Sequence, residues 1–295
     1  MKTEENFHQI SYDLQKKSFD DDSLDHMYFD TWFDETTVDY WRHMRMMKPV
    51  YPLLKWKKWL TVGDGRWGLD SIRLKKANIS ISVLPTDLTE NLLRKSRDRG
   101  SIEKYSVENA ESLSFQDNEF DVAFCKEAYH HFPRPFLALY EMLRVVSKAV
   151  ILAEPNDQIP RPIARGILEA VMNLAKKQNP FVDSNFEPIG NYVYTISKRE
   201  LIKTATSIQL PLVAFYEFDD HYVQGVEHEK LSENGPLLRK IKRKLSIGKL
   251  LVKLGLRNHQ HMIAILFKVM PDEQLMQELK KNGFKLLPVP KNPYV

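Results

Sequence analysis

The chain has 295 residues, of which 43% are hydrophobic and 28% charged, and its formal net charge is +4. This composition is too apolar for a disordered chain, and the length suits one large domain or two small ones with a buried core. The sequence has no run of about 18 uncharged apolar residues and a single cysteine, Cys125, which excludes a transmembrane helix, a disulfide framework and a Cys-rich zinc site. The polar, acidic N-terminus lacks the apolar core of a secretory signal, so we expect a cytoplasmic enzyme.

Charge is distributed unevenly along the chain. Residues 1–40 hold eleven Asp or Glu and three Lys or Arg, whereas residues 234–271 hold nine Lys or Arg and no acid. The basic segment carries Leu and Ile at helical spacing, which predicts a surface helix over residues 237–257. Such a helix would suit contact with a membrane surface or a polyanion. The alternative is a solvated helix face packed on the core. We expect no specific nucleic-acid partner.

Residues 1–52 are predicted to form helices that precede the sheet and cover a cofactor. A glycine cluster follows, because three of the eleven glycines, Gly63, Gly65 and Gly68, fall within six residues. Apolar residues 59–62 predict a buried strand before the cluster, and helical apolar spacing resumes directly after it. A G-x-G-x-x-G pattern between strand and helix favours a nucleotide-binding turn, where glycines allow close backbone approach and the helix N-terminus offers free N–H groups. The alternative is a purely structural turn.

A second strand is predicted over residues 79–84, with Asp87 just beyond its end. Asp87 lies 19 residues after Gly68, where nucleotide-binding folds place a carboxylate that accepts hydrogen bonds from both ribose hydroxyls. Alternatively, Asp87 or Thr89 caps the following helix.

Strands and helices continue to alternate after this point. Strands are predicted over residues 104–107, 120–125 and 149–153, and a helix over residues 136–146. The alternation predicts an α/β fold with a doubly wound, mostly parallel seven-stranded sheet and helices on both faces. Because ligands in such sheets bind beyond the carboxyl ends of the strands, candidate site residues lie at 63–68, 87, 108–111, 126–131 and 154–157.

The chain is predicted to divide into four parts. These are an N-terminal helical cap (1–52), a core (53–156), an inserted acceptor lid (157–258), and a final strand with a C-terminal helix (259–295). The lid is predicted to contain a helix over residues 163–177 and a late strand within residues 213–223, and the final strand is predicted over residues 260–269. Three aromatic residues of the lid suit an acceptor pocket or pack within the lid itself: Phe181, Tyr192 and Tyr194.

Residues 55–156 resemble the class I S-adenosylmethionine (SAM)-dependent methyltransferases, and most of all the Rossmann-like type 11 branch. Four segments carry the resemblance: VGDGRWG, PTDLTENLL, ENAESLSFQDNEFDVAFCKEAYHHF and LALYEMLRVVSKAVILAEP. The resemblance implies methyltransferase activity of the EC 2.1.1 class with S-adenosyl-L-methionine as the cofactor.

The resemblance also implies which residues contact that cofactor. The glycine loop would lie beside its methionine and ribose parts, the acid after strand two would bind the ribose, and the residues that follow strands two and three would contact the adenine. The implied cofactor-binding residues are Gly63, Asp64, Gly65, Gly68, Asp87, Leu88, Asn109, Ala110 and Lys126. A group ahead of strand one would hold the cofactor carboxylate, with four candidates: Tyr40, Arg42, His43 and Arg45. Two positions depart from the family pattern, because Thr61 replaces a frequent acid and Trp67 replaces the third glycine.

Candidate catalytic residues follow predicted strand four. Methyl transfer to a hydroxyl benefits from a general base, and imidazole titrates near neutral pH. We interpret His130 and His131 as candidate bases, with Glu127 as a further candidate, while the alternative is that the imidazoles only hydrogen-bond the backbone. Glu154 with Glu127 or His130 would also suit Mg²⁺, although a metal-free site is the favoured interpretation.

These observations predict a SAM-dependent methyltransferase that acts on a small-molecule or sugar/glycan acceptor at oxygen. One alternative is an NAD(P)-dependent oxidoreductase, because the glycine pattern and Asp87 also suit a nicotinamide cofactor. The other is a non-catalytic SAM-binding or scaffold protein.

Overall fold

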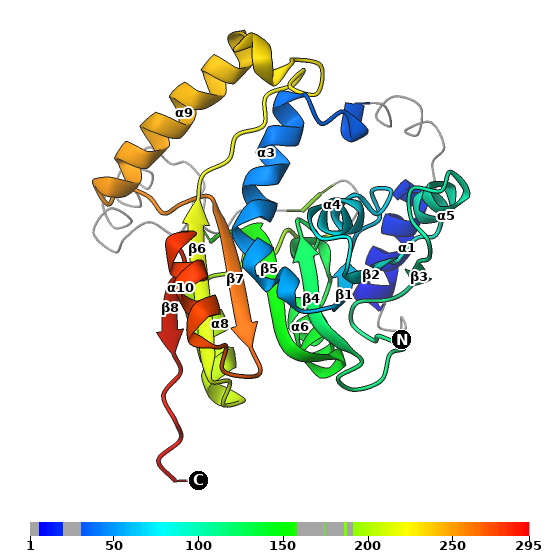
Figure 1. The fold of residues 1–295 in the computed structure, drawn as a ribbon, viewed down its shortest axis with the longest axis vertical. Coiled ribbons are helices and arrows are strands. Elements are labelled where there is room, and N and C mark those ends of the chain that lie inside the picture. The colour runs from blue at the N-terminus through cyan, green and yellow to red at the C-terminus, as the bar shows by residue number, and fades with distance from the viewer. Residues whose placement is uncertain (1–5, 20–30, 158–173, 175–185, 188–190, 295) are drawn as a thin grey trace.

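The fold is built on one eight-stranded sheet with the order β3-β2-β1-β4-β5-β7-β6-β8 (Figure 1). The computed structural model describes residues 6–19, 31–157, 174, 186–187 and 191–294. The strands are β1 (Lys58–Val62), β2 (Ser82–Asp87), β3 (Ser106–Val107), β4 (Phe120–Lys126), β5 (Val146–Pro155), β6 (Leu212–Phe218), β7 (His261–Phe267) and β8 (Lys285–Pro288). The first five strands pair in parallel, whereas β7 is antiparallel to β5 and β6, and β8 is antiparallel to β6. The predicted α/β class with a mostly parallel sheet is confirmed.

The structure corrects the strand prediction at the last strand and at the start of the second. The strand predicted over residues 260–269 is not the last, because β8 follows it and pairs with β6. This eighth strand is only four residues long and largely exposed, so it lacks the buried apolar run that marks the central strands. The second strand begins at Ser82 rather than residue 79, because Asn78 Oδ1 accepts hydrogen bonds from the backbone N–H and the hydroxyl of Ser80 and forms a turn there.

Helices cover both faces of the sheet. They are α1 (Phe7–Phe19), α3 (Val38–Met47), the 3₁₀ helix η2 (Lys48–Lys55), α4 (Leu69–Ala77), α5 (Asn91–Asp98), α6 (Pro135–Val145), α8 (Lys198–Ser207), α9 (Pro236–Lys253) and α10 (Glu273–Lys281). Short 3₁₀ turns, η3 (Tyr129–His131) and η4 (Leu231–Glu233), complete the set. Apart from Leu174, the helix predicted over residues 163–177 lies outside the described residues, and so does Phe181. Within the described part of the chain, no helix is long and apolar enough to cross a membrane.

The two faces of the sheet bury separate apolar cores. In β4, Val122 and Phe124 face the core shared with α3, η2 and α10, while Ala123 and Cys125 face the core shared with α6 and α8. Successive side chains of a strand point to opposite faces, so a strand covered on both sides reads as a continuous apolar run. This arrangement fixes the carboxyl ends of β1, β2 and β4 side by side at one edge of the sheet.

Candidate functional site

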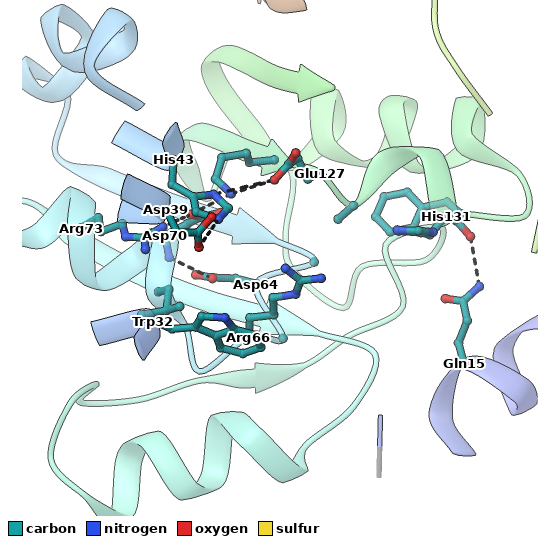
Figure 2. Close-up of a pocket in the computed structure, with 16 residues that line it drawn as sticks. Gln15, Trp32, Asp39, His43, Asp64, Arg66, Asp70, Arg73, Glu127 and His131 are labelled. Carbon is teal, nitrogen blue, oxygen red and sulfur yellow. Dashed lines mark hydrogen bonds and ion pairs between the residues drawn. The ribbon is translucent and has the colours of Figure 1, made fainter. Parts of the chain in front are cut away.

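Two adjoining hollows lie at the carboxyl ends of β1, β2 and β4, and three residues, Gln15, Gly63 and Phe132, line both of them. The larger hollow has a volume of about 130 Å³. It lies between α3, the glycine loop and the loop after β4 (Figure 2). The smaller hollow, of about 30 Å³, is lined by the end of β2 and the segment after β3.

The glycine loop comes so close to its neighbours that side chains do not fit at two positions. Gly63 has φ +74°, and a Cβ atom there would lie well under 3.0 Å from the Cβ of Ala128. At Gly65 an added Cβ would lie 2.5 Å from the carboxylate of Asp87. Glycine is therefore needed for contact between loops, in addition to any need for close approach of a ligand. Gly68, with φ +66°, is the N-cap of α4 and lines neither hollow.

The Asp64 carboxylate is bound to the start of α4. It accepts hydrogen bonds from the backbone N–H groups of Asp70 (3.1 Å) and Ser71 (2.9 Å) and from the Thr61 hydroxyl (2.8 Å). Burial, with the nearby charge of Asp70, raises the pKa of Asp64 to about 7. The side chain thus holds the glycine loop to the helix and also lines the larger hollow.

Asp87 lies at the base of the smaller hollow with three other predicted residues, Leu88, Asn109 and Ala110. One carboxylate oxygen of Asp87 accepts hydrogen bonds from the backbone N–H (2.9 Å) and hydroxyl (2.8 Å) of Thr89. Burial raises the pKa of this carboxyl. These bonds form a turn ahead of α5 and use one of the two oxygens. The capping alternative is wrong, because the N-cap of α5 is Glu90 and no side chain within the described chain caps that helix. The Asn109 side-chain oxygen similarly accepts the Glu111 N–H (2.9 Å).

Glu127 lies beside one lysine and two imidazoles. It adopts φ +51°, a left-handed conformation that is uncommon for a residue other than glycine. Its carboxylate lies 3.7 Å from Lys126 Nζ and 3.8 Å from ring nitrogens of His43 and His261. Although burial opposes ionisation, these neighbours lower the pKa of Glu127 to about 2. The group is therefore an anion at neutral pH, and Lys126 Nζ also lies 3.3 Å from the Asp70 carboxylate.

His130 and His131 point to different partners. His130 Nδ1 lies 2.6 Å from Glu154 Oε2, and the other Glu154 oxygen accepts the backbone N–H groups of Ala128 and Tyr129, each at 3.0 Å. Burial lowers the pKa of His130, but the Glu154 carboxylate outweighs it and raises the pKa overall. The ring is buried and is not part of the wall of either hollow.

His131 does line the larger hollow. Its Nδ1 lies 3.0 Å from Asn191 Nδ2 and 3.0 Å from Glu187 Oε2, and its carbonyl accepts a hydrogen bond from Gln15 Nε2 (Figure 2). Burial and the neighbouring His130 lower the pKa of His131. Its imidazole therefore favours the neutral form, which is the form that accepts a proton.

Of the four candidates ahead of β1, the structure brings only His43 to the wall of the larger hollow. Arg42 and Arg45 instead pair with the buried carboxylate of Asp220. Tyr40 stacks on Arg73, with 5.6 Å from the guanidinium to the ring centroid.

Sequence reasoning missed several residues of the larger hollow. They are Gln15, Trp32, Asp39, Asp70 and Arg73, whereas Arg66 falls within the predicted range 63–68. The Arg66 guanidinium lies 5.3 Å from the Trp32 ring centroid, so the aromatic and the cation close one side of the hollow together (Figure 2). The spacing of Asp70 and Arg73, three residues apart on one helix, was a signal for a charged pair, whereas nothing local predicts Gln15 or Trp32.

Comparison with known proteins decides between the predicted families. Residues 60–153 match the family model described as a methyltransferase domain. These residues are a class I SAM-dependent methyltransferase domain of the type 11 branch. The resemblance and the predicted cofactor, S-adenosyl-L-methionine, are thereby confirmed, and the nicotinamide alternative is not supported. A search of curated proteins finds no significant match.

Solved structures share the fold of this chain at low sequence identity. One is a phosphoethanolamine N-methyltransferase 2 from Haemonchus contortus, in complex with phosphomonomethylethanolamine and S-adenosylhomocysteine. It is 13% identical with a TM-score of 0.54, and the alignment covers 88% of this chain and 61% of the H. contortus chain. A magnesium protoporphyrin IX methyltransferase from Synechocystis PCC 6803, with bound SAM, is 10% identical with a TM-score of 0.50 and covers 88% of this chain and 97% of its own. At these identities the likeness shows the fold alone.

Proposed function

We propose that this methyltransferase transfers the methyl group of SAM to a hydroxyl oxygen of a small-molecule or sugar/glycan acceptor. The observation that carries the proposal is the pair of adjoining hollows on the glycine loop, with His131 on the wall of the larger one. The residues that line the smaller hollow suit contacts with a nucleoside, and those that line the larger one suit contacts with the methionine part and an acceptor.

The residues present fit the cofactor. The backbone at Gly63 and Gly65 lies where added Cβ atoms would collide with Ala128 and Asp87, so the loop wall is bare backbone against which a ligand can lie. The second carboxylate oxygen of Asp87 would accept from the ribose hydroxyls, and Leu88 and Ala110 would flank the adenine. Cationic groups at the larger hollow would neutralise the cofactor carboxylate: Arg66, Arg73 and Lys126. Burial lowers the pKa of His43, so its imidazole favours the neutral form and would contribute a hydrogen bond only.

The chain contributes position and proton transfer. The cofactor supplies an activated methyl group on a sulfonium, which needs little more than an aligned nucleophile. His131 Nε2 would accept the proton of the acceptor hydroxyl, since its Nδ1 already lies beside Glu187 and Asn191. Glu127, with a pKa of about 2, is a poor base; we assign it to electrostatic stabilisation of positive charge in the hollow. His130, held by Glu154, is a positioning residue for the loop that carries His131.

Calorimetry with purified protein tests the cofactor part of the proposal. We expect binding of SAM and S-adenosylhomocysteine, no binding of NAD(H), and loss of binding in Asp87→Ala. A matched control is Asp98→Ala, because Asp98 is an exposed acid at the end of α5, outside both hollows. Equal affinity of Asp87→Ala and the intact chain would refute the assignment of the smaller hollow.

An acceptor screen with methyl-labelled SAM tests the catalytic part. For any hydroxyl acceptor found, His131→Gln should lower kcat by about 10²–10⁴-fold while S-adenosylhomocysteine affinity is retained. Unchanged kcat in His131→Gln would overturn the base assignment. Cofactor binding without methylation of any hydroxyl acceptor would favour transfer to another atom or the non-catalytic alternative.

A further inference from the structure

The longest helix of the described chain, α9, has an unusual composition. It runs over 18 residues as PLLRKIKRKLSIGKLLVK, with seven Lys or Arg and no acidic residue. Figure 1 shows it along the outside of the molecule, beyond α3 and the end of β6. Neither hollow of the proposed active site includes a residue of this helix.

Only part of α9 packs on the protein. Leu238 and Ile241 are fully buried against Val38 of α3 and against Val226. The Glu229 carboxylate accepts the backbone N–H groups of Leu237 (2.9 Å) and Leu238 (2.7 Å) at the start of the helix. The helix is thus held firmly through its first turns.

The second half of α9 turns apolar side chains to the outside. Ile247, Leu250 and Leu254 are 49%, 55% and 63% exposed. Their spacing of three and four residues places them in one stripe along the helix. Isolated exposed leucines are ordinary, but a stripe on the face opposite the buried residues has no partner within the described chain.

Cations surround this stripe. Lys253 is exposed three residues after Leu250, and the exposed Arg243 lies one turn before Ile247 on the same face. Lysine and arginine stems can extend from an apolar surface while their charged ends reach toward phosphate groups. An exposed apolar stripe flanked by cations is the pattern of a helix that lies in a membrane interface.

We propose that α9 docks this methyltransferase on an anionic lipid bilayer, with Ile247, Leu250 and Leu254 in the interface. Charge complementarity selects the occupant, because seven cations without one acid are repelled by a basic surface and attracted by acidic headgroups. The apolar stripe selects a bilayer over a soluble polyanion, since leucines gain nothing from phosphates alone. The inference is independent of the acceptor.

Vesicle co-sedimentation of the full chain tests the proposal. We expect binding to vesicles that mix phosphatidylserine with phosphatidylcholine, little binding to phosphatidylcholine alone, and weaker binding at high salt. Arg243→Gln with Lys253→Gln should lower the partition coefficient by roughly 25-fold. Lys280→Gln with Lys281→Gln is the matched control, because these exposed lysines lie on α10, and it should change binding far less.

The apolar stripe is tested by Leu250→Ser with Leu254→Ser, which should weaken binding by roughly 5-fold per leucine. In addition, Leu250→Trp should show a blue-shifted emission component on anionic vesicles. No binding to anionic vesicles would overturn the proposal. The proposal would also be overturned if the Leu250/Leu254 double variant bound vesicles as well as the intact chain and the new tryptophan showed no emission shift. The protein would then bind negative charge alone, and a soluble polyanion such as heparin would bind it equally well.

Discussion

Replacing Gly63 with alanine tests the close approach between the glycine loop and the loop after β4. Two terms oppose the substitution. A left-handed φ costs about 1–2 kcal/mol for a residue with a Cβ, and the Cβ would lie under 3.0 Å from that of Ala128. Since carbon atoms pack at about 3.5–4.0 Å, the loops must separate by at least about 0.5 Å. Such overpacking adds about 1–3 kcal/mol, so we expect a total loss of about 2–5 kcal/mol.

Gly100 provides a matched control for the first term. It has the same φ of +74°, but an added Cβ would meet no atom within 4 Å. Gly100→Ala should therefore lower the free energy of unfolding by about 1–2 kcal/mol and leave S-adenosylhomocysteine affinity unchanged. Chemical denaturation and calorimetry of both variants measure the two effects. Equal stability losses and equal affinities in Gly63→Ala and Gly100→Ala would refute the packing argument.

Three further predictions concern the carboxylates of the site. Asp87→Asn should weaken S-adenosylhomocysteine binding by about tenfold or more, because an amide replaces one of two acceptor oxygens with a donor; calorimetry decides, and unchanged affinity contradicts it. Glu154→Gln should lower the pKa of His130, measured by NMR titration, and destabilise the fold by about 3 kcal/mol. Because the pKa of His130 is raised in the folded state, protonated His130 stabilises the fold fully below its unfolded pKa near 6.5. This stabilisation is lost as the pH rises through the folded pKa. A difference in unfolding free energy between the intact chain and Glu154→Gln that does not shrink over this rise contradicts the pairing. Glu127→Gln should lower the pKa of His43 further, because the Glu127 charge is one of the groups that raise it against burial. The same variant should lower SAM affinity more than S-adenosylhomocysteine affinity, because only SAM carries the sulfonium charge; equal losses for both ligands contradict the electrostatic role.

The sequence predicts most of the sheet because its buried strands are continuous apolar runs. Residues 59–62 and 120–125 fall within one residue of β1 and β4, since both strands are covered on two faces. The pattern fails at the edge of the sheet. β8 is exposed and short, and its pairing with β6 depends on contacts more than 70 residues apart in sequence, such as Val213 with Leu287. Nothing in four local residues specifies such a partner.

In the candidate site, too, residues of local motifs could be predicted and residues from distant segments could not. Residues that belong to a local motif at a strand end, such as Asp87 and Asn109, are brought together as predicted. Residues that reach the site from distant segments were not predictable: Gln15 contacts His131 across 116 positions of the chain, and His261 approaches Glu127 from β7. The roles of His130 and His131 also could not be separated from sequence, because only the fold shows that Glu154 binds the first.

The two departures from the family pattern are explained by their neighbours. Thr61 lacks the usual carboxylate, but its hydroxyl donates to Asp64, and that carboxylate binds the N–H groups of Asp70 and Ser71 at the start of α4. An acid three residues later thus provides an acceptor within the same loop. Trp67 adopts φ +62° without being glycine, at a cost of about 1–2 kcal/mol.

Burial offsets that cost at Trp67. Its ring is 1% exposed and lies 4.6 Å from the Arg99 guanidinium, while its carbonyl accepts the Ser96 hydroxyl at 2.7 Å. Burying a large aromatic side chain contributes about 2–3 kcal/mol, which is at least as large as the backbone penalty. The displaced third glycine, Gly68, then supplies the left-handed turn directly before α4. The loop therefore keeps bare backbone at Gly63 and Gly65, the two glycines that line the hollows. The residues that differ from the family pattern, Thr61 and Trp67, instead contact other parts of the protein.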